Sequence, residues 1–95
     1  MFCKILTTWL SFIFLKVLKV EEVEKALIKE LGKKIAACRK AKNFTQAELS
    51  ANINMEEAAL RRIELGGTNP TFKTLYRIAT GLEMPLKELF DFSAS

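Results

Sequence analysis

Histidine is absent from this 95-residue chain, and only two cysteines, Cys3 and Cys38, are present. Without histidine, neither a Ser-His-Asp nor a Cys-His nucleophile can be assembled. Two cysteines alone are a poor zinc-binding set. The glycines do not form a phosphate-binding loop motif. The sequence therefore predicts a protein that is not an enzyme and that requires no metal ion, no cofactor and no small-molecule substrate.

Proline is also scarce, and strand patterns are missing. The two prolines, Pro70 and Pro85, fall at the boundaries of helical patterns, and no segment alternates apolar and polar residues over the length of a strand. The connections between helical patterns are about two to six residues long, as a compact bundle requires. The predicted fold class is therefore all-α.

The charge balance is basic but modest. Fifteen Lys and Arg residues stand against eleven Asp and Glu residues, which gives a net charge of +4 at pH 7. A positive balance favours polyanionic partners such as nucleic acid. Ordinary solubility explains a charge of this size at least as well, so charge alone does not assign a partner.

Residues 1–30 differ in character from residues 31–92, which we treat as the folding domain. The run from Ile5 to Leu15 is apolar and rich in aromatic residues, but its eleven residues fall short of the roughly 20 that cross a bilayer. No small-residue cleavage site follows it. Four interpretations stay open: a helix that packs on the domain or on a second copy, a weak membrane anchor, a signal sequence, or a stretch translated upstream of the natural start.

Residues 20–31 follow the spacing of an amphipathic helix. Val20, Val23, Leu27 and Leu31 share one side, and charged residues occupy the other. We interpret this segment as a solvated connecting helix. Gly32 is expected to loosen its junction with the domain.

Five helices are predicted within the domain, over residues 31–42, 46–52, 56–65, 71–80 and from residue 85 onward. Thr45 and Glu48 have the spacing of a capping box at the start of the second helix. Asn43 and Asn54 suit the left-handed conformation that ends a helix. The apolar residues expected to fill the core are Leu31, Ile35, Cys38, Phe44, Leu49, Ile53, Met55, Ala59, Leu60, Ile63, Phe72, Leu75, Ile78, Ala79, Leu82, Met84, Leu86, Leu89 and Phe90.

The second and third predicted helices have the proportions of a DNA-binding motif. Two short helices joined by a turn of three or four residues form the helix-turn-helix unit, in which the second helix enters the major groove. Here residues 46–52 precede the turn Ile53-Asn54-Met55, and residues 56–65 follow it.

Residues 31–90 resemble the phage-repressor and Cro-like helix-turn-helix family, often called the XRE family. The resemblance rests on an ordered set of features: Arg39 late in the first helix, Thr45-Gln46 at the start of the second, Arg62-Ile63-Glu64 closing the third, and Asn69-Pro70 after it. It implies a five-helix, lambda-repressor-like bundle. It also implies sequence-specific binding of double-stranded DNA by a homodimer in the cytoplasm, as a transcriptional regulator such as a repressor.

The family's residue roles can be transferred by position. Arg39 and Glu64 match a pair that joins the first helix to the third. Arg61 and Arg62 fall on or beside the exposed face that meets bases and backbone in the family. Of the two, Arg62 is the candidate for reading a base, since arginine can pair bidentately with guanine, and Arg61 is the candidate for a phosphate contact. The remaining candidate DNA contacts are Thr45 and Gln46 at the second helix, Glu57 and Ala58 on the third, and Thr68 and Asn69 in the loop. Ordinary solvated roles stay open for Gln46, Arg61 and Arg62.

The third helix departs from the family pattern at its start. Glu56 and Glu57 stand where the family commonly has Ser or Thr followed by Gln. Two carboxylates would repel phosphate, although Glu57 could accept a hydrogen bond from a cytosine amino group. The alternative hypothesis is a protein-interaction module without DNA, tethered to a membrane through residues 5–20.

Overall fold

The computed structural model describes the backbone of residues 2–92. In the first helix it describes the side chains of Ile13 and Lys16 and of all residues from Lys19 onward. The described chain contains five helices and no strand: α1 (Phe2–Ala41), α2 (Gln46–Asn52), α3 (Glu57–Glu64), α4 (Phe72–Gly81) and α5 (Leu86–Leu89). This confirms the predicted all-α, five-helix class.

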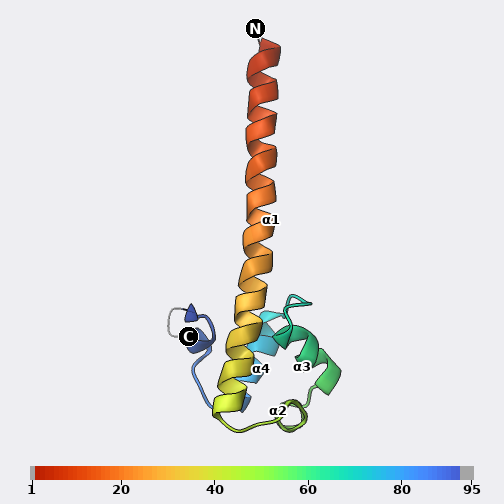
Figure 1. Ribbon diagram of the computed structural model, residues 1–95, viewed down its shortest axis with the longest axis vertical. Coiled ribbons are helices and arrows are strands. Elements are labelled where there is room, and N and C mark those ends of the chain that lie inside the picture. Colours follow the sequence, from red (N-terminus) through yellow and green to blue (C-terminus); the bar gives the residue numbers. More distant parts are fainter. Residues whose placement is uncertain (1, 93–95) are drawn as a thin grey trace.

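The molecule consists of a small bundle from which one long helix projects (Figure 1). Its extents are 63 × 27 × 18 Å, and the C-terminal quarter of α1 forms one side of the bundle. The apolar run Ile5–Leu15 lies in the projecting part, and its side chains other than Ile13 are outside the described residues. Among the described residues, no helical segment is both long enough and apolar enough to cross a bilayer.

The predicted loosening at Gly32 is wrong, because α1 continues through this residue for a total of 40 residues. Gly32 is buried against α3. A Cβ atom added here would lie 2.5 Å from the carbonyl oxygen of Ile63 and 2.6 Å from that of Glu64. The glycine therefore permits a close approach of two helix backbones and does not introduce flexibility.

Local capping fixes the start of α2. The Thr45 hydroxyl accepts a hydrogen bond from the Glu48 backbone at 3.0 Å, and the Glu48 carboxylate accepts one from the Thr45 backbone at 3.2 Å, so the predicted capping box is present. Asn43 and Asn54 have φ angles of 62° and 53°, as predicted. Glu83, with φ of 57°, is a left-handed residue that the sequence did not indicate.

Eleven buried apolar residues form one core shared by all five helices. Its members are Leu31, Ile35, Leu49, Ile53, Leu60, Ile63, Leu75, Ile78, Ala79, Leu82 and Leu89. Cys38, Phe44, Met55, Met84 and Leu86 pack against it, partly buried. The predicted burial of Phe72 and Phe90 is wrong, since these side chains are 71% and 46% exposed. Both lie at helix ends: Phe72 is the first residue of α4, and Phe90 follows the last residue of α5.

Candidate nucleic-acid interface

The turn between α2 and α3 is held by buried and hydrogen-bonded residues. Ile53 is buried in the core, and the Met55 backbone N–H donates to the Ser50 carbonyl at 2.8 Å. Asn54, between them, takes the left-handed conformation that reverses the chain. The angle between α2 and α3 is therefore set by packing and backbone geometry, as a helix-turn-helix unit requires.

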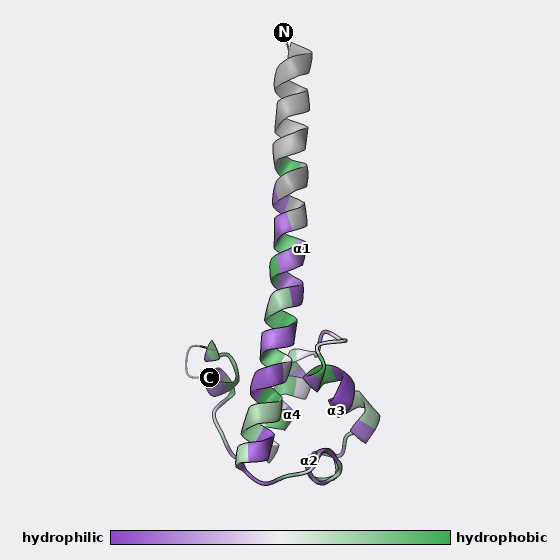
Figure 2. Ribbon diagram, viewed as in Figure 1, coloured by the Kyte–Doolittle hydropathy of each residue, from purple (hydrophilic) through white to green (hydrophobic). Residues whose placement is uncertain are grey.

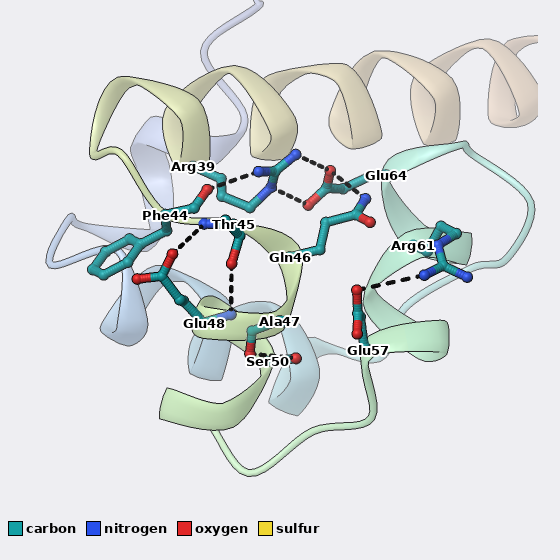
Figure 3. A network of polar contacts seen from close by, with 10 residues as sticks. All are labelled: Arg39, Phe44, Thr45, Gln46, Ala47, Glu48, Ser50, Glu57, Arg61 and Glu64. Atoms are coloured by element: carbon teal, nitrogen blue, oxygen red, sulfur yellow. Dashed lines mark hydrogen bonds and ion pairs between the residues drawn. The ribbon is translucent and has the colours of Figure 1, made fainter.

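A buried ion pair connects α1 to α3 (Figure 3). The Arg39 guanidinium contacts both carboxylate oxygens of Glu64, with Nε–Oε2 at 2.8 Å and Nη2–Oε1 at 3.0 Å. Its third nitrogen donates to the Phe44 carbonyl at 2.8 Å. The two side chains are only 10% and 5% exposed. The structure thus brings Arg39 and Glu64 together in the bidentate geometry that arginine forms with carboxylates.

Gln46 belongs to the same network. Its side-chain amide donates to Glu64 Oε1 at 3.1 Å, so Glu64 receives hydrogen bonds from α1 and from the start of α2. The –NH₂ group carries two hydrogens, and one remains for another acceptor. Gln46 is only partly buried, and Thr45 beside it is exposed. The Thr45 hydroxyl accepts within the capping box and still has its own hydrogen to donate.

The outer side of α3 is polar and exposed. Leu60, Ile63 and Glu64 are its buried residues. The predicted contact residues Glu57, Ala58, Arg61 and Arg62 are all exposed.

Two of these side chains contact each other. Arg61 Nη2 lies 3.5 Å from Glu57 Oε1, and both side chains are about half exposed, so this pair is weak. Among the described residues, no carboxylate pairs with Arg62. The exposed surface of α3 therefore offers one free guanidinium and one that is loosely held.

The loop after α3 packs against α1 and presents Thr68 and Asn69 to solvent. Gly66 has a φ of 76°, and a Cβ atom added here would lie 2.9 Å from Cα of Lys29. The loop and α1 together line a hollow that includes Lys25, Lys29, Thr68 and Asn69. Both lysines belong to the segment that is predicted to be a solvated helix. Their place beside the loop could not be predicted, because no local pattern links Lys29 to Gly66.

A family model for the HTH_3 helix-turn-helix domain matches residues 35–89, which is more than half of the chain. The chain belongs to the HTH_3 family. This confirms the resemblance to XRE-type domains and makes the protein a DNA-binding transcriptional regulator. The match includes the exposed α3 surface, the Arg39–Glu64 pair and the Thr68-Asn69 loop.

Solved structures show the same HTH_3 fold. The restriction-modification controller protein C.AhdI from Aeromonas hydrophila is 25% identical, with a TM-score of 0.67 over 68% of this chain and 98% of that one. An HTH_3 family transcriptional regulator from Vibrio cholerae is 25% identical, with a TM-score of 0.69 over 75% of this chain and 41% of that one.

A third structure is similar in fold alone. The clp gene regulator ClgR from C. glutamicum is 20% identical, with a TM-score of 0.68 over 72% of this chain and 87% of that one. A search of curated proteins finds no match. Each of the three structures matches three quarters of this chain or less, so at least a quarter of the chain is unmatched in every comparison.

Proposed function

We propose that this HTH_3 protein binds double-stranded DNA sequence-specifically, with α3 in the major groove, and regulates transcription as a cytoplasmic homodimer. The observation that carries the proposal is the arrangement of α3. Its inner side is fixed by the buried Arg39–Glu64 pair, while Arg61 and Arg62 project from its outer side. A rigidly held helix with two exposed arginines can enter a groove without reorganising.

The proposed contacts divide into base and phosphate contacts. Arg62 reads guanine, since its guanidinium has no ion pair with a described residue to break and has the fork geometry for O6 and N7. When DNA binds, Arg61 leaves Glu57 and contacts a phosphate, because its 3.5 Å ion pair with Glu57 is exposed and weak. Glu57 and Ala58 lie beside these arginines and face the base edges.

Phosphate contacts flank α3 on both sides. Gln46 and Thr45 at the start of α2 each have a hydrogen to donate, and helix N-termini favour anions. On the other side of α3, Thr68 and Asn69 contact the sugar-phosphate backbone of the DNA. Lys25 and Lys29 line the same hollow as these two residues and add positive charge to it. Contacts of this kind position the domain and supply most of the affinity.

The names of the similar structures support a regulatory role. The Aeromonas hydrophila protein is a restriction-modification controller, and the Vibrio cholerae protein is a transcriptional regulator. We propose a role as a repressor for a steric reason: a small domain that occupies an operator can block access to it. The proposed function is binding without catalysis.

One observation favours a second candidate function. Glu56 and Glu57 are both exposed at the start of α3, and the Glu56 side chain forms no capping hydrogen bond. An acidic start to this helix would suit a basic protein surface better than DNA. The second candidate is therefore a protein-interaction module, with the projecting part of α1 as a tether.

The deciding experiment is a selection of bound duplexes from a random pool by the full chain, at several salt concentrations. DNA binding predicts an enriched sequence and an affinity that falls linearly with salt on logarithmic axes. Recovery of no enriched sequence, with affinity no better than that of a non-binding control protein, would reject the first candidate and favour the second.

A further inference from the structure

The outer side of α3 ends in an exposed leucine. Leu65 directly follows the last residue of the helix and is 73% exposed, the largest exposure among the described large apolar residues. It belongs neither to the core nor to the partly buried residues that pack against the core. The fold therefore leaves this side chain in solvent, where a binding partner can contact it.

Leu65 lies on the same side of the helix as the residues proposed to contact DNA. It follows Ala58 by seven residues, Arg61 by four and Arg62 by three. Its backbone is still helical, with φ of −79° and ψ of −9°. At 3.6 residues per turn, its direction from the helix axis lies between those of the two arginines, about 20° from that of Ala58. Figure 2 shows the resulting mixture of apolar and hydrophilic stretches along α3.

The chain after Leu65 leaves this side chain uncovered. Gly66 and Gly67 donate backbone hydrogen bonds to the carbonyl groups of Ile63 at 3.0 Å and Arg62 at 2.9 Å, so the chain turns back at the end of α3. Neither glycine has a side chain that could shield Leu65 or hold a duplex away from it. A duplex that contacts the two arginines can therefore also contact Leu65.

The length of α3 brings both of its ends within one groove. Its eight residues extend about 12 Å, and the major groove of B-DNA is about 12 Å wide. The first residues of a recognition helix lie closest to the bases. The apolar residue at that end is the short Ala58, whereas the one at the far end is the longer Leu65. The longer side chain compensates for the greater distance between the helix axis and the bases.

The major groove presents one apolar group, the C5-methyl group of thymine. The other groups on its base edges are hydrogen-bond donors and acceptors. A leucine placed against a donor or acceptor would displace water without replacing its hydrogen bond, which is unfavourable. Contact with the methyl group instead buries apolar surface on both molecules. Thymine is thus the base that suits an exposed leucine on this helix.

We propose that Leu65 selects thymine by packing against its C5-methyl group in the major groove. This inference rests on the proposed function, because it requires α3 to enter that groove. Leu65 and Arg62 are about 4.5 Å apart along the helix axis, and successive base pairs are about 3.4 Å apart. The thymine contacted by Leu65 therefore lies one or two base pairs from the guanine contacted by Arg62.

Removal of the methyl group from the duplex tests this contact. In the duplex that the full wild-type chain enriches from the random pool, each thymine is replaced in turn by deoxyuridine, which lacks only the methyl group. Binding of wild type should weaken about fourfold at one position of each half-site, as expected for the loss of one buried methyl group. The Leu65→Ala chain should bind the thymine duplex more weakly than wild type and should not respond to the same replacement.

Two variants control for general effects. Leu65→Met keeps an apolar side chain of similar length and should still respond to loss of the methyl group. Leu27→Ala removes a leucine that is 48% exposed on the projecting part of α1, and it should bind DNA as wild type does. Thermal unfolding of all variants should match that of wild type, since neither leucine is buried.

The outcomes separate the role of Leu65 from the function on which it rests. An enriched sequence without a methyl-sensitive thymine, or a Leu65→Ala chain as sensitive as wild type, overturns the role of Leu65 alone. Equal weakening of Leu65→Ala on all duplexes, with methyl sensitivity retained, shows a contact with the sugar-phosphate backbone and also overturns it. The absence of any enriched sequence overturns the proposed function as well.

Discussion

Arg39 and Glu64 face each other across the interface of α1 and α3, 25 residues apart in sequence, with nitrogen–oxygen distances of 2.8 and 3.0 Å. The same carboxylate accepts from Gln46 at 3.1 Å. One buried glutamate therefore links α1, the start of α2 and the end of α3. This side chain therefore adds to the core packing of Leu60 and Ile63 in fixing the orientation of the proposed DNA-contacting helix.

The first prediction concerns this pair. Glu64→Gln should lower the free energy of unfolding by about 3–5 kcal/mol, because it leaves the buried Arg39 charge without its partner. Urea denaturation of the full chain measures the loss. The double variant Arg39→Met/Glu64→Leu should be less destabilised than the sum of Arg39→Met and Glu64→Leu. Strict additivity of the two single changes would show that the pair does not act as a unit.

Three glycines provide a graded test of the packing. Gly32→Ala should lower stability by about 1–3 kcal/mol, although alanine favours a helix, because its methyl group meets backbone oxygens that cannot move aside. Gly81→Ala should cost less, since its nearest neighbour is the side chain of Ile53 at 2.5 Å. Gly67→Ala is the matched control and should be neutral or slightly stabilising, as its nearest neighbour lies 3.6 Å away. Thermal unfolding that ranks the variants in another order would contradict this account of the α1–α3 contact.

Gln46 is predicted to act on phosphate. Gln46→Ala should weaken binding to all duplexes by a similar factor, because phosphates carry no sequence information. Competition of several unrelated duplexes for wild type and variant measures this. Loss of preference at one base position, with the other positions unchanged, would instead make Gln46 a base contact.

The hollow between α1 and the loop after α3 gives a prediction about salt. Each of Lys25→Gln and Lys29→Gln should reduce the slope of log affinity against log salt concentration by about 1, because one fewer counterion is released. Lys87→Gln on α5 is the control and should leave the slope unchanged. Equal effects of all three substitutions would indicate that these lysines act through the overall charge of the protein and that Lys25 and Lys29 make no local contact with DNA.

Local features of the domain could be predicted from the sequence. The capping box at Thr45 and the left-handed Asn43 and Asn54 depend on neighbours within a few residues, and each is present in the structure. The buried faces of α2 and α3 likewise follow from helical spacing. The family's ordered motifs supplied the fold, since they extend from Arg39 in the first helix of the domain to Pro70 before α4.

Features that depend on contacts between distant segments could not be predicted. In a sequence, a glycine such as Gly32 suggests local flexibility. Only the position of α3 shows that its lack of a side chain permits close packing. Phe72 has the helical spacing of a core residue, but it is 71% exposed at the first residue of α4. Lys29 meets the loop at Gly66, which helical periodicity cannot indicate.

The central claim is that the exposed side of α3 reads the sequence of a duplex, and Arg62 is its most direct test. The selection from a random pool should be carried out with wild type and with Arg62→Ala. We expect the variant to lose preference for guanine at one position of each half-site, with specific binding weaker by about 1–3 kcal/mol. An enriched sequence and an affinity identical to those of wild type would contradict the account.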